Sequence, residues 1–271
     1  MKSKKFLIFT VILLVVCASL TLVACGGASK QSVTITGSSS VSPLMQKLAT
    51  EFERLNKNIQ IRISTSDSST GITDTIVGKN DIGMSSRNIK DNEKGITETK
   101  IADDGVVMIV NNATALKDIT SQQVYDLYAS GVAVGGVVGA ISREEGSGTR
   151  DAFDGLIVNK DGAKLSAMVK FADCVDIQNS TGNVMVEITS NITKVGYISL
   201  GSLSDSVSAL TFNGVKATAD NIKNKTYKLA RPFMLTTKEG KPLSSAAQRF
   251  MDFILGAGGQ KIVTSNGYIA L

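Results

Sequence analysis

Residues 142–153, with the sequence SREEGSGTRDAF, combine a guanidinium, carboxylates, hydroxyls and two closely spaced glycines ahead of a helix-like segment. Arginine offers a planar, permanently charged donor pair, while hydroxyls and backbone amides are neutral donors. Such a set can bind an oxyanion, support a nucleophile, or form a polar turn that caps a helix. The stretch lacks the lysine-then-hydroxyl ending of a P-loop, which argues against nucleotide hydrolysis.

Two further segments share the order of strand, Ser/Gly-rich turn and helix start: ITGSSSVSPL (35–44) and STSDSSTGI (64–72). A fourth, DIGMSSR (81–87), ends a strand in polar residues. The first N–H groups of a helix are unpaired and carry partial positive charge, and glycines let the backbone approach an anion closely. One such turn alone is best explained as an ordinary helix cap. Three in one chain favour a shared anion site.

Histidine is absent, and Cys174 is the only cysteine after Cys25. These counts exclude Ser-His-Asp and Cys-His catalysis and His-ligated zinc, and leave Ser-Lys, carboxylate or all-oxygen metal sites for an enzyme. No internal disulfide is expected if Cys25 is lipidated. We expect no cofactor, no metal and no catalytic residue.

The N-terminus has the pattern of an export signal. Three lysines precede the apolar run 6–20, and LVAC (22–25) closes it. LVAC resembles the lipobox of bacterial lipoproteins, so residues 1–24 are interpreted as a signal peptide, Cys25 as the lipidated residue and 25–31 as a tether. The alternative is a plain transmembrane anchor. Removal of three lysines and no acids lowers the net charge from +5 to +2, and no basic stripe with aromatics remains, so no nucleic-acid partner is expected.

Alternating elements predict an α/β fold with largely parallel sheets. Helical spacing of apolar residues marks 38–56, where positions 41, 44, 45, 48, 52 and 55 recur on one face. Further helices are expected at 68–80, 121–130 and 244–271, the last with a tail. Strands are expected at 32–37, 59–65, 81–87, 105–114, 135–144 and 195–203.

In these segments the chain resembles the substrate-binding lipoproteins of bacterial ABC-type phosphate transporters, which have a type II periplasmic-binding fold. DIGMSSR and REEGSGTRDAF, in this order and spacing, carry the resemblance, which extends over the whole chain after Cys25. It implies two α/β lobes with a ligand cleft between them: lobe one from 32–108 plus 229–271, and lobe two from 109–228. It also implies a monomer, lipid-anchored outside the cell membrane, that delivers phosphate to the permease subunits of the importer.

By position, the resemblance implies that phosphate is bound by Ser39, Ser40, Ser68, Ser86, Arg143, Ser147, Gly148 and Thr149. Ser38 is an additional candidate, and Glu145 is the candidate for orienting the Arg143 guanidinium. The alternative for Arg143 is a surface ion pair with Glu144 or Glu145.

One position departs from the family pattern. Many members carry an aspartate that accepts the proton of bound phosphate, and Ser86 stands there in this chain, followed by Arg87. Arg87 either acts as a second cation or lies outside the site. The acceptor is then Ser86 itself through its lone pairs, a nearby carboxylate such as Asp67 or Glu145, or no residue, and Asp67 is the first candidate because it adjoins Ser68. Asp81 is expected to be a structural cap.

Two other functions remain open at this point. A binding protein for another tetrahedral oxyanion, sulfate or molybdate, would use the same donors. A phosphate-ester hydrolase would need a metal cluster or an activated nucleophile, for which the usual histidine supports are missing.

Overall fold

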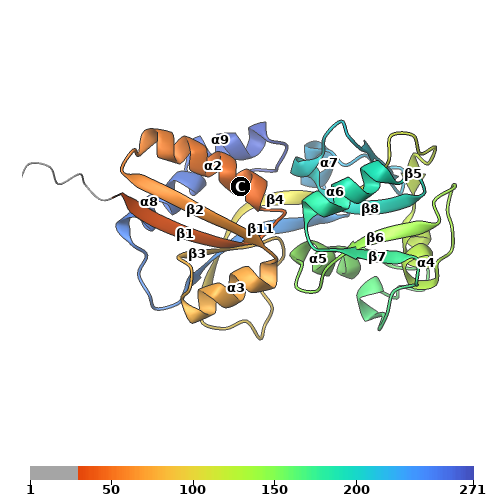
Figure 1. The fold of residues 1–271 in the computed structure, drawn as a ribbon, viewed down its shortest axis with the longest axis horizontal. Coiled ribbons are helices and arrows are strands. Elements are labelled where there is room, and N and C mark those ends of the chain that lie inside the picture. The colour runs from red at the N-terminus through yellow and green to blue at the C-terminus, as the bar shows by residue number, and fades with distance from the viewer. Residues whose placement is uncertain (1–29) are drawn as a thin grey trace, which may run out of the picture.

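The structure, a computed structural model, describes residues 30–271, so Cys25 and the signal-peptide interpretation lie outside the described residues. Two α/β lobes lie side by side, and two long strands run from one into the other (Figure 1). Among residues 30–271, no helix is long and apolar enough to cross a membrane.

The first lobe places its helices on both faces of a sheet. Its elements are β1 (Gln31–Ser38), α2 (Ser42–Leu55), β2 (Ile59–Ser66), α3 (Ser68–Val77), β3 (Ile82–Ser85), α8 (Ser245–Leu255) and α9 (Ala257–Ser265). Strand β1 lies between β2 and β3 and pairs with both in parallel. The carboxyl ends of three strands therefore meet at one edge of the sheet, which is where ligands bind in open α/β sheets.

The second lobe repeats this arrangement with other elements. They are β5 (Asp118–Ile119), α4 (Ser121–Ser130), β6 (Gly139–Arg143), α5 (Gly148–Leu156), β7 (Val175–Gln178), α6 (Thr181–Ser190), β8 (Lys194–Ser199), β9 (Ser208–Ala209), β10 (Thr211–Phe212), α7 (Ala219–Lys223) and the 3₁₀ turns Leu165–Ala167 and Leu200–Ser202. Strand β6 pairs in parallel with β7 and β8.

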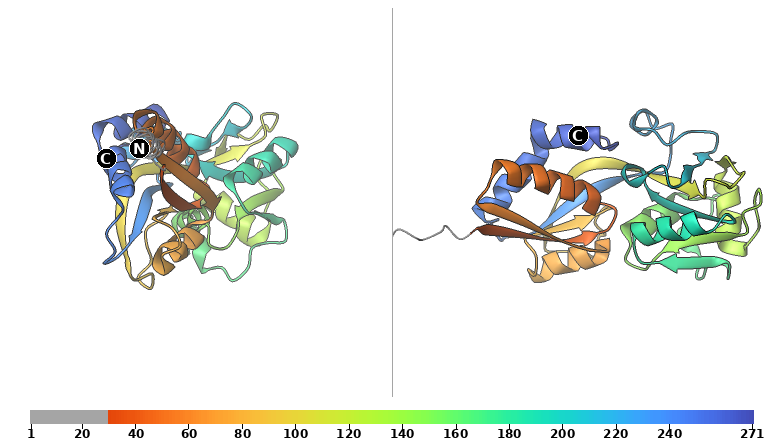
Figure 2. Two further views of the ribbon diagram at one scale, coloured as in Figure 1. Left: turned by 60° about the vertical axis from the view of Figure 1, so that its left-hand side comes forward. Right: turned by 45° about the horizontal axis from the view of Figure 1, so that its top comes forward.

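The neck between the lobes consists of β4 (Ile96–Val110) and β11 (Ala230–Lys238), which pair antiparallel. The second half of β4 pairs antiparallel with β8, so the strands form one continuous path, β2-β1-β3-β11-β4-β8-β6-β7. Figure 2 shows both strands crossing between the lobes. The α/β prediction is confirmed, but the sheet is mixed rather than largely parallel, because both neck strands run against their neighbours.

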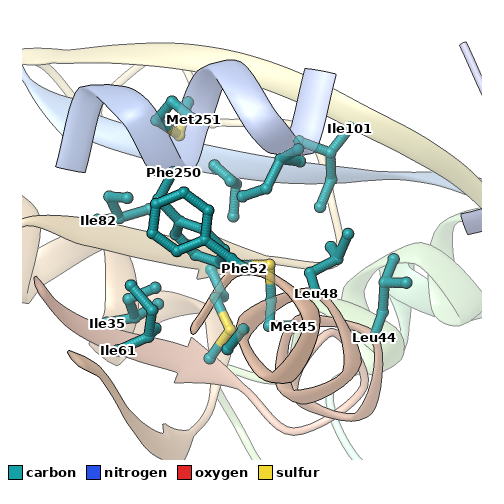
Figure 3. Packing of buried hydrophobic residues seen from close by; sticks show 14 of the residues in the cluster. Ile35, Leu44, Met45, Leu48, Phe52, Ile61, Ile82, Ile101, Phe250 and Met251 are labelled. Atoms are coloured by element: carbon teal, nitrogen blue, oxygen red, sulfur yellow. The ribbon is translucent and has the colours of Figure 1, made fainter. Parts of the chain in front are cut away.

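Each lobe has its own hydrophobic core. In the first, Leu48 and Phe52 of α2 pack towards the sheet and towards Phe250 of α8 (Figure 3). The predicted apolar face of α2 is buried except at its last position, since Leu55 is 56% exposed. In the second core, the rings of Phe153 and Tyr197 stack with centroids 3.9 Å apart.

The change from one core to the other falls in the neck. Ala102 packs in the first core, whereas Val106, Met108 and Leu229 pack in the second. The predicted limits assigned those three residues to lobe one, so they are a few residues off. The predicted C-terminal helix is also divided in two, because α8 ends at Leu255 and α9 begins at Ala257.

Candidate functional site

Four helix starts meet between the lobes: those of α2 and α3 from the first, and those of α5 and α6 from the second. The Ser40 hydroxyl, just ahead of α2, lies 2.7 Å from the Thr149 hydroxyl of α5 and 3.0 Å from the Thr181 hydroxyl of α6. Because each helix start carries partial positive charge and unpaired N–H groups, their convergence favours a bound anion.

Glycines make this close packing possible. Gly37, at the end of β1, has φ +129°, and a Cβ on Gly71 would lie 2.7 Å from the Gly37 Cα. A Cβ on Gly148 would lie 2.4 Å from the Ser68 hydroxyl oxygen, which belongs to the other lobe. A side chain at position 148 would therefore force the Ser68 hydroxyl to move or hold the start of α5 further from the first lobe.

A hydroxyl cluster lies at the carboxyl edge of the first sheet. The Ser38 hydroxyl donates to the Ser86 hydroxyl at 3.0 Å, and the Ser86 backbone N–H donates to the Ser68 hydroxyl at 3.1 Å. The Ser38 hydroxyl in turn accepts from the Ser40 backbone N–H at 3.3 Å. All four serines are buried. Since a hydroxyl proton rotates freely about its C–O bond, the cluster can present several donors to an anion.

Arg143, the last residue of β6, is 2% exposed and reaches across to the first lobe. Its Nη2 donates to the Ser39 hydroxyl at 3.0 Å, and its Nη1 donates to the Thr181 hydroxyl at 3.3 Å. The Glu144 carboxylate accepts from Nε and Nη2 at 2.7 and 2.6 Å. The guanidinium is thus fixed in one plane while it bridges the lobes.

This geometry excludes the alternative for Arg143 and corrects one expectation about it. The pair with Glu144 exists, but it is not a surface ion pair, because Arg143 is buried. The prediction that Glu145 orients the guanidinium is wrong: Glu144 holds it, and Glu145 is exposed.

The other residues expected from SGT (147–149) lie at the start of α5. Ser147 caps the helix, its hydroxyl accepting from the Arg150 N–H at 3.3 Å. Gly148 and Thr149 are the first two residues of the helix, so their N–H groups have no acceptor within it. Both are buried against the hydroxyl cluster.

Thr181 was missed by sequence reasoning. Its hydroxyl contacts Ser40 and Arg143, and its N–H donates to the Ser39 hydroxyl at 3.3 Å. The signal was present, because IQNSTGNV (177–184) repeats the order of strand, Ser/Gly-rich turn and helix start.

Three charged candidates lie outside the hydroxyl cluster or have structural partners. Asp67 caps α3, and its two carboxylate oxygens accept from the Thr70 N–H and hydroxyl at 2.8 and 2.6 Å. The structure therefore does not turn it towards Ser86. Arg87 is held by Glu93 through two hydrogen bonds of 2.8 and 2.6 Å, so it is not a second cation of the cluster. Asp81 accepts from Thr34 at the start of β3, as a structural cap should.

The site is therefore a set of donors with one charged arginine. Within residues 30–271, no group of three or more acidic, cysteine or histidine side chains could hold a metal ion. The Glu144 carboxylate is bonded to the Arg143 guanidinium rather than to the hydroxyl cluster, and Arg143 compensates its charge. Such a site can strip an oxyanion of water and hold it by hydrogen bonds.

A buried ion pair lies in the neck beside the cleft. Asp104 of β4 accepts from the Ser199 hydroxyl at 2.8 Å and from Arg231 of β11 at 3.1 Å. Burial raises the pKa of Asp104 to about 6, although the Arg231 charge opposes the shift. Burial likewise lowers the pKa of Arg231.

Comparison with known protein families gives one match to this chain. The model of the PBP superfamily domain matches residues 23–257.

Solved structures give close matches over most of the chain. A putative phosphate ABC transporter substrate-binding protein with bound phosphate, from Clostridium perfringens, is 36% identical, with 89% of this chain and all of that chain covered and a TM-score of 0.82. An ABC-type phosphate transport receptor from Vibrio cholerae is 27% identical over the same shares, with a TM-score of 0.70.

Curated relatives give a partial match and a full-length one. Phosphate-binding protein PstS 2 of Streptococcus agalactiae is 42% identical over 140 residues, which is 50% of this chain but only 46% of that protein. The chain thus matches about half the length of this relative. Phosphate-binding protein PstS of Borreliella burgdorferi is 25% identical over 90% of this chain and 91% of its own.

Proposed function

Since the chain belongs to the PBP superfamily, we propose that its lobes close on one inorganic phosphate ion and that it serves an ABC-type importer as the phosphate-binding component. The relatives named above that bind phosphate support this proposal, as does the donor set in the cleft. The ligands are the eight residues expected from the sequence, joined by Thr181.

One observation carries the proposal: Arg143 is buried and bridges both lobes among hydroxyls from four helix starts. A dehydrated phosphate needs donors on all sides, and a single guanidinium with several neutral donors supplies them without unpaired positive charges in the closed cleft. Hydroxyls also suit an anion that carries a proton, because each can donate or accept.

Calorimetry of the protein with phosphate, sulfate and ATP side by side tests the proposal. We expect one phosphate per chain and no binding of ATP, because direct contacts between the lobes leave no room for a nucleoside beside the phosphate. Absence of phosphate binding would overturn the proposal.

Another tetrahedral oxyanion, sulfate or molybdate, is the second candidate. The observation that favours it is the serine at position 86, where many members of the family carry an acceptor carboxylate, together with the engagement of Asp67 by Thr70. A hydroxyl can donate to an unprotonated sulfate oxygen, so it rejects sulfate less strongly than a carboxylate does. Sulfate binding equal to or tighter than phosphate binding would establish this candidate.

The remaining parts of the proposal concern the setting of the protein. We propose that it binds without catalysis, as a monomer, and is tethered through lipidated Cys25 to the outer face of the cell membrane. The permease subunits of the importer would then receive phosphate from the opened cleft.

A further inference from the structure

Four charged residues at one side of the cleft form an ion-pair group, here called the rim cluster: Arg87, Lys90 and Glu93 of the first lobe and Asp151 of the second. Asp151 lies in the first turn of α5, two residues after Thr149. The rim cluster therefore involves the same helix whose start faces the hydroxyl cluster.

The donors of Arg87 are almost all used within its own lobe. Its Nη1 donates to the Asn88 carbonyl and to Glu93, at 2.9 and 2.8 Å. Its Nη2 donates to the Ser69 hydroxyl and to Glu93, at 3.1 and 2.6 Å. These contacts hold the guanidinium in place whether or not the second lobe is near, and they leave the Nε–H as its one remaining donor.

That remaining group faces the second lobe. Arg87 Nε lies 3.0 Å from Asp151 Oδ2, an ion-pair contact whose N–H direction is too oblique for a hydrogen bond. Lys90 Nζ lies 2.6 Å from the same oxygen. Both ion pairs of Asp151 in the described chain thus cross between the lobes. Arg87 is 5% exposed, so its contact with Asp151 is largely shielded from water.

We propose that Asp151 is an interlobe latch: its ion pairs with Arg87 and Lys90 stabilise the closed cleft and thereby set the affinity for the anion, although none of these residues is among the proposed ligands. This inference rests on the proposed function. If a ligand binds only the closed form, its apparent association constant is the intrinsic constant multiplied by the fraction of protein that is closed. A smaller closed fraction therefore means weaker apparent binding. Loss of the latch should therefore weaken binding of every anion by the same factor.

The variant Asp151→Asn distinguishes the latch from a long-range electrostatic effect, because the two predict changes in anion affinity of opposite sign. Removing a negative charge near an anion site should tighten anion binding if only the field matters. If the latch operates, phosphate binding should weaken at least about fivefold, and arsenate binding should weaken equally. Asp151→Glu, which keeps the carboxylate, should recover part of the loss.

Asp173→Asn is the matched control. It makes the same charge change in the same lobe, but the pair of Asp173 with Lys170 is exposed and does not cross between the lobes. Its phosphate affinity should stay within twofold of wild type. Thermal unfolding of both variants checks that each is folded.

A second arm uses Lys90→Met in the wild type and in Asp151→Asn. The latch predicts a clear loss of phosphate affinity in the wild type and a much smaller loss once Asp151 is gone. Equal losses in the two backgrounds, or an Asp151→Asn variant that binds phosphate as tightly as wild type or more tightly, would overturn the latch.

Failure of the proposed function has a different signature, which is absence of phosphate binding by the wild type. X-ray scattering of the ligand-free protein then still decides the latch. A larger radius of gyration in Asp151→Asn than in the wild type and in Asp173→Asn is expected, and equal radii would overturn the latch.

Discussion

Arg143 combines full charge, burial and contacts to both lobes, so its removal should harm binding more than that of any single hydroxyl. Arg143→Ala leaves the Glu144 carboxylate without its partner and the anion without its cation. We expect phosphate affinity to fall by at least about 2 kcal/mol, or roughly thirtyfold. Arg143→Lys should recover only part, because an ammonium cannot reproduce the planar donor pair.

Calorimetry checks this prediction. Arg54→Ala, which breaks an exposed ion pair with Glu51 on α2, is the control and should bind normally. Binding by Arg143→Ala within twofold of wild type would remove Arg143 from the site.

Ser86 should determine how strongly sulfate is rejected. A carboxylate at this position would accept the phosphate O–H and repel an unprotonated sulfate oxygen. We expect Ser86→Asp to raise the phosphate-to-sulfate affinity ratio at least about tenfold, or 1.4 kcal/mol. Asp67→Asn should leave the ratio unchanged, because Asp67 is engaged by Thr70. Competition titrations measure the phosphate-to-sulfate affinity ratio of both variants. A ratio that falls in Asp67→Asn and stays unchanged in Ser86→Asp would show that Asp67 is the acceptor.

At the scale of single residues, the sequence predicts which residues lie in the cleft better than it predicts their hydrogen-bond partners. Arg143 and the serines, which the family resemblance implies, lie together between the lobes, and their binding of phosphate stays a prediction. The sequence prediction chose Glu145 instead of Glu144 as the partner of Arg143, because two adjacent side chains beyond the end of a strand differ only in direction. It could not show that Asp67 turns towards Thr70, because capping and ligand binding use the same residue types.

At the scale of the elements, the start of α5 must fit against the first lobe. Gly148→Ala would put a Cβ 2.4 Å from the Ser68 hydroxyl oxygen, so the lobes could not close fully. We expect phosphate affinity to fall at least about tenfold with little loss of thermal stability, since alanine favours helix. Gly155→Ala, in the same helix with open space at its Cβ, is the matched control.

The pair in the neck strands should make stability depend on pH. The pKa of Asp104 is about 6 in the folded protein and 3.8 in its ordinary state, so the folded form binds more protons between these values. Its stabilising contribution is therefore complete below pH about 4 and declines as pH rises to about 6. Asp104→Asn, which resembles the protonated carboxyl, lacks this decline.

Denaturant unfolding at pH 4, 5, 6 and 7 measures the effect. The free energy of unfolding of the wild type relative to Asp104→Asn should decrease as pH rises from 4 to 6 and then level off. Burial also raises the pKa of Asp154 to about 6, but that group is common to both proteins and cancels in the difference. A difference that increases with pH would contradict the assignment.

Helices with a regular apolar face, such as α2 and α4, are predicted by the sequence, whereas the first half of β4, strand β11 and helix α6 are not. The first half of β4, ITETKIADD (96–104), has apolar side chains only at Ile96, Ile101 and Ala102, so it lacks the alternation that indicates a strand, and the sequence does not predict it. In β11 a register shift between Phe233 and Met234 interrupts the alternation. Helix α6 buries Thr181, Val184 and Ile188 at helical spacing, but its β-branched residues obscure the pattern.

At the scale of the whole molecule, the lipid anchor proposed at Cys25 can be tested by fractionation. Cys25→Ala should release folded protein from the membrane fraction, because two buried acyl chains, such as palmitate, anchor stably where one binds only marginally. Cys174→Ala is the control and should stay in the membrane fraction. Unchanged retention of Cys25→Ala would rule out lipidation at this residue.

The order of strands in the first lobe also restricts the order in which the chain can fold. Strand β11 lies between β3 and β4, yet it is made after the whole of lobe two. The two ends of lobe two are already neighbours, since the Val106 N–H donates to the Leu229 carbonyl at 2.8 Å. The polypeptide is synthesised with its N-terminus first, so lobe two can close as soon as Leu229 has been made. At that point β1, β2 and β3 still lack β11, the strand that joins them to β4. The part of the protein synthesised first is therefore the part completed last.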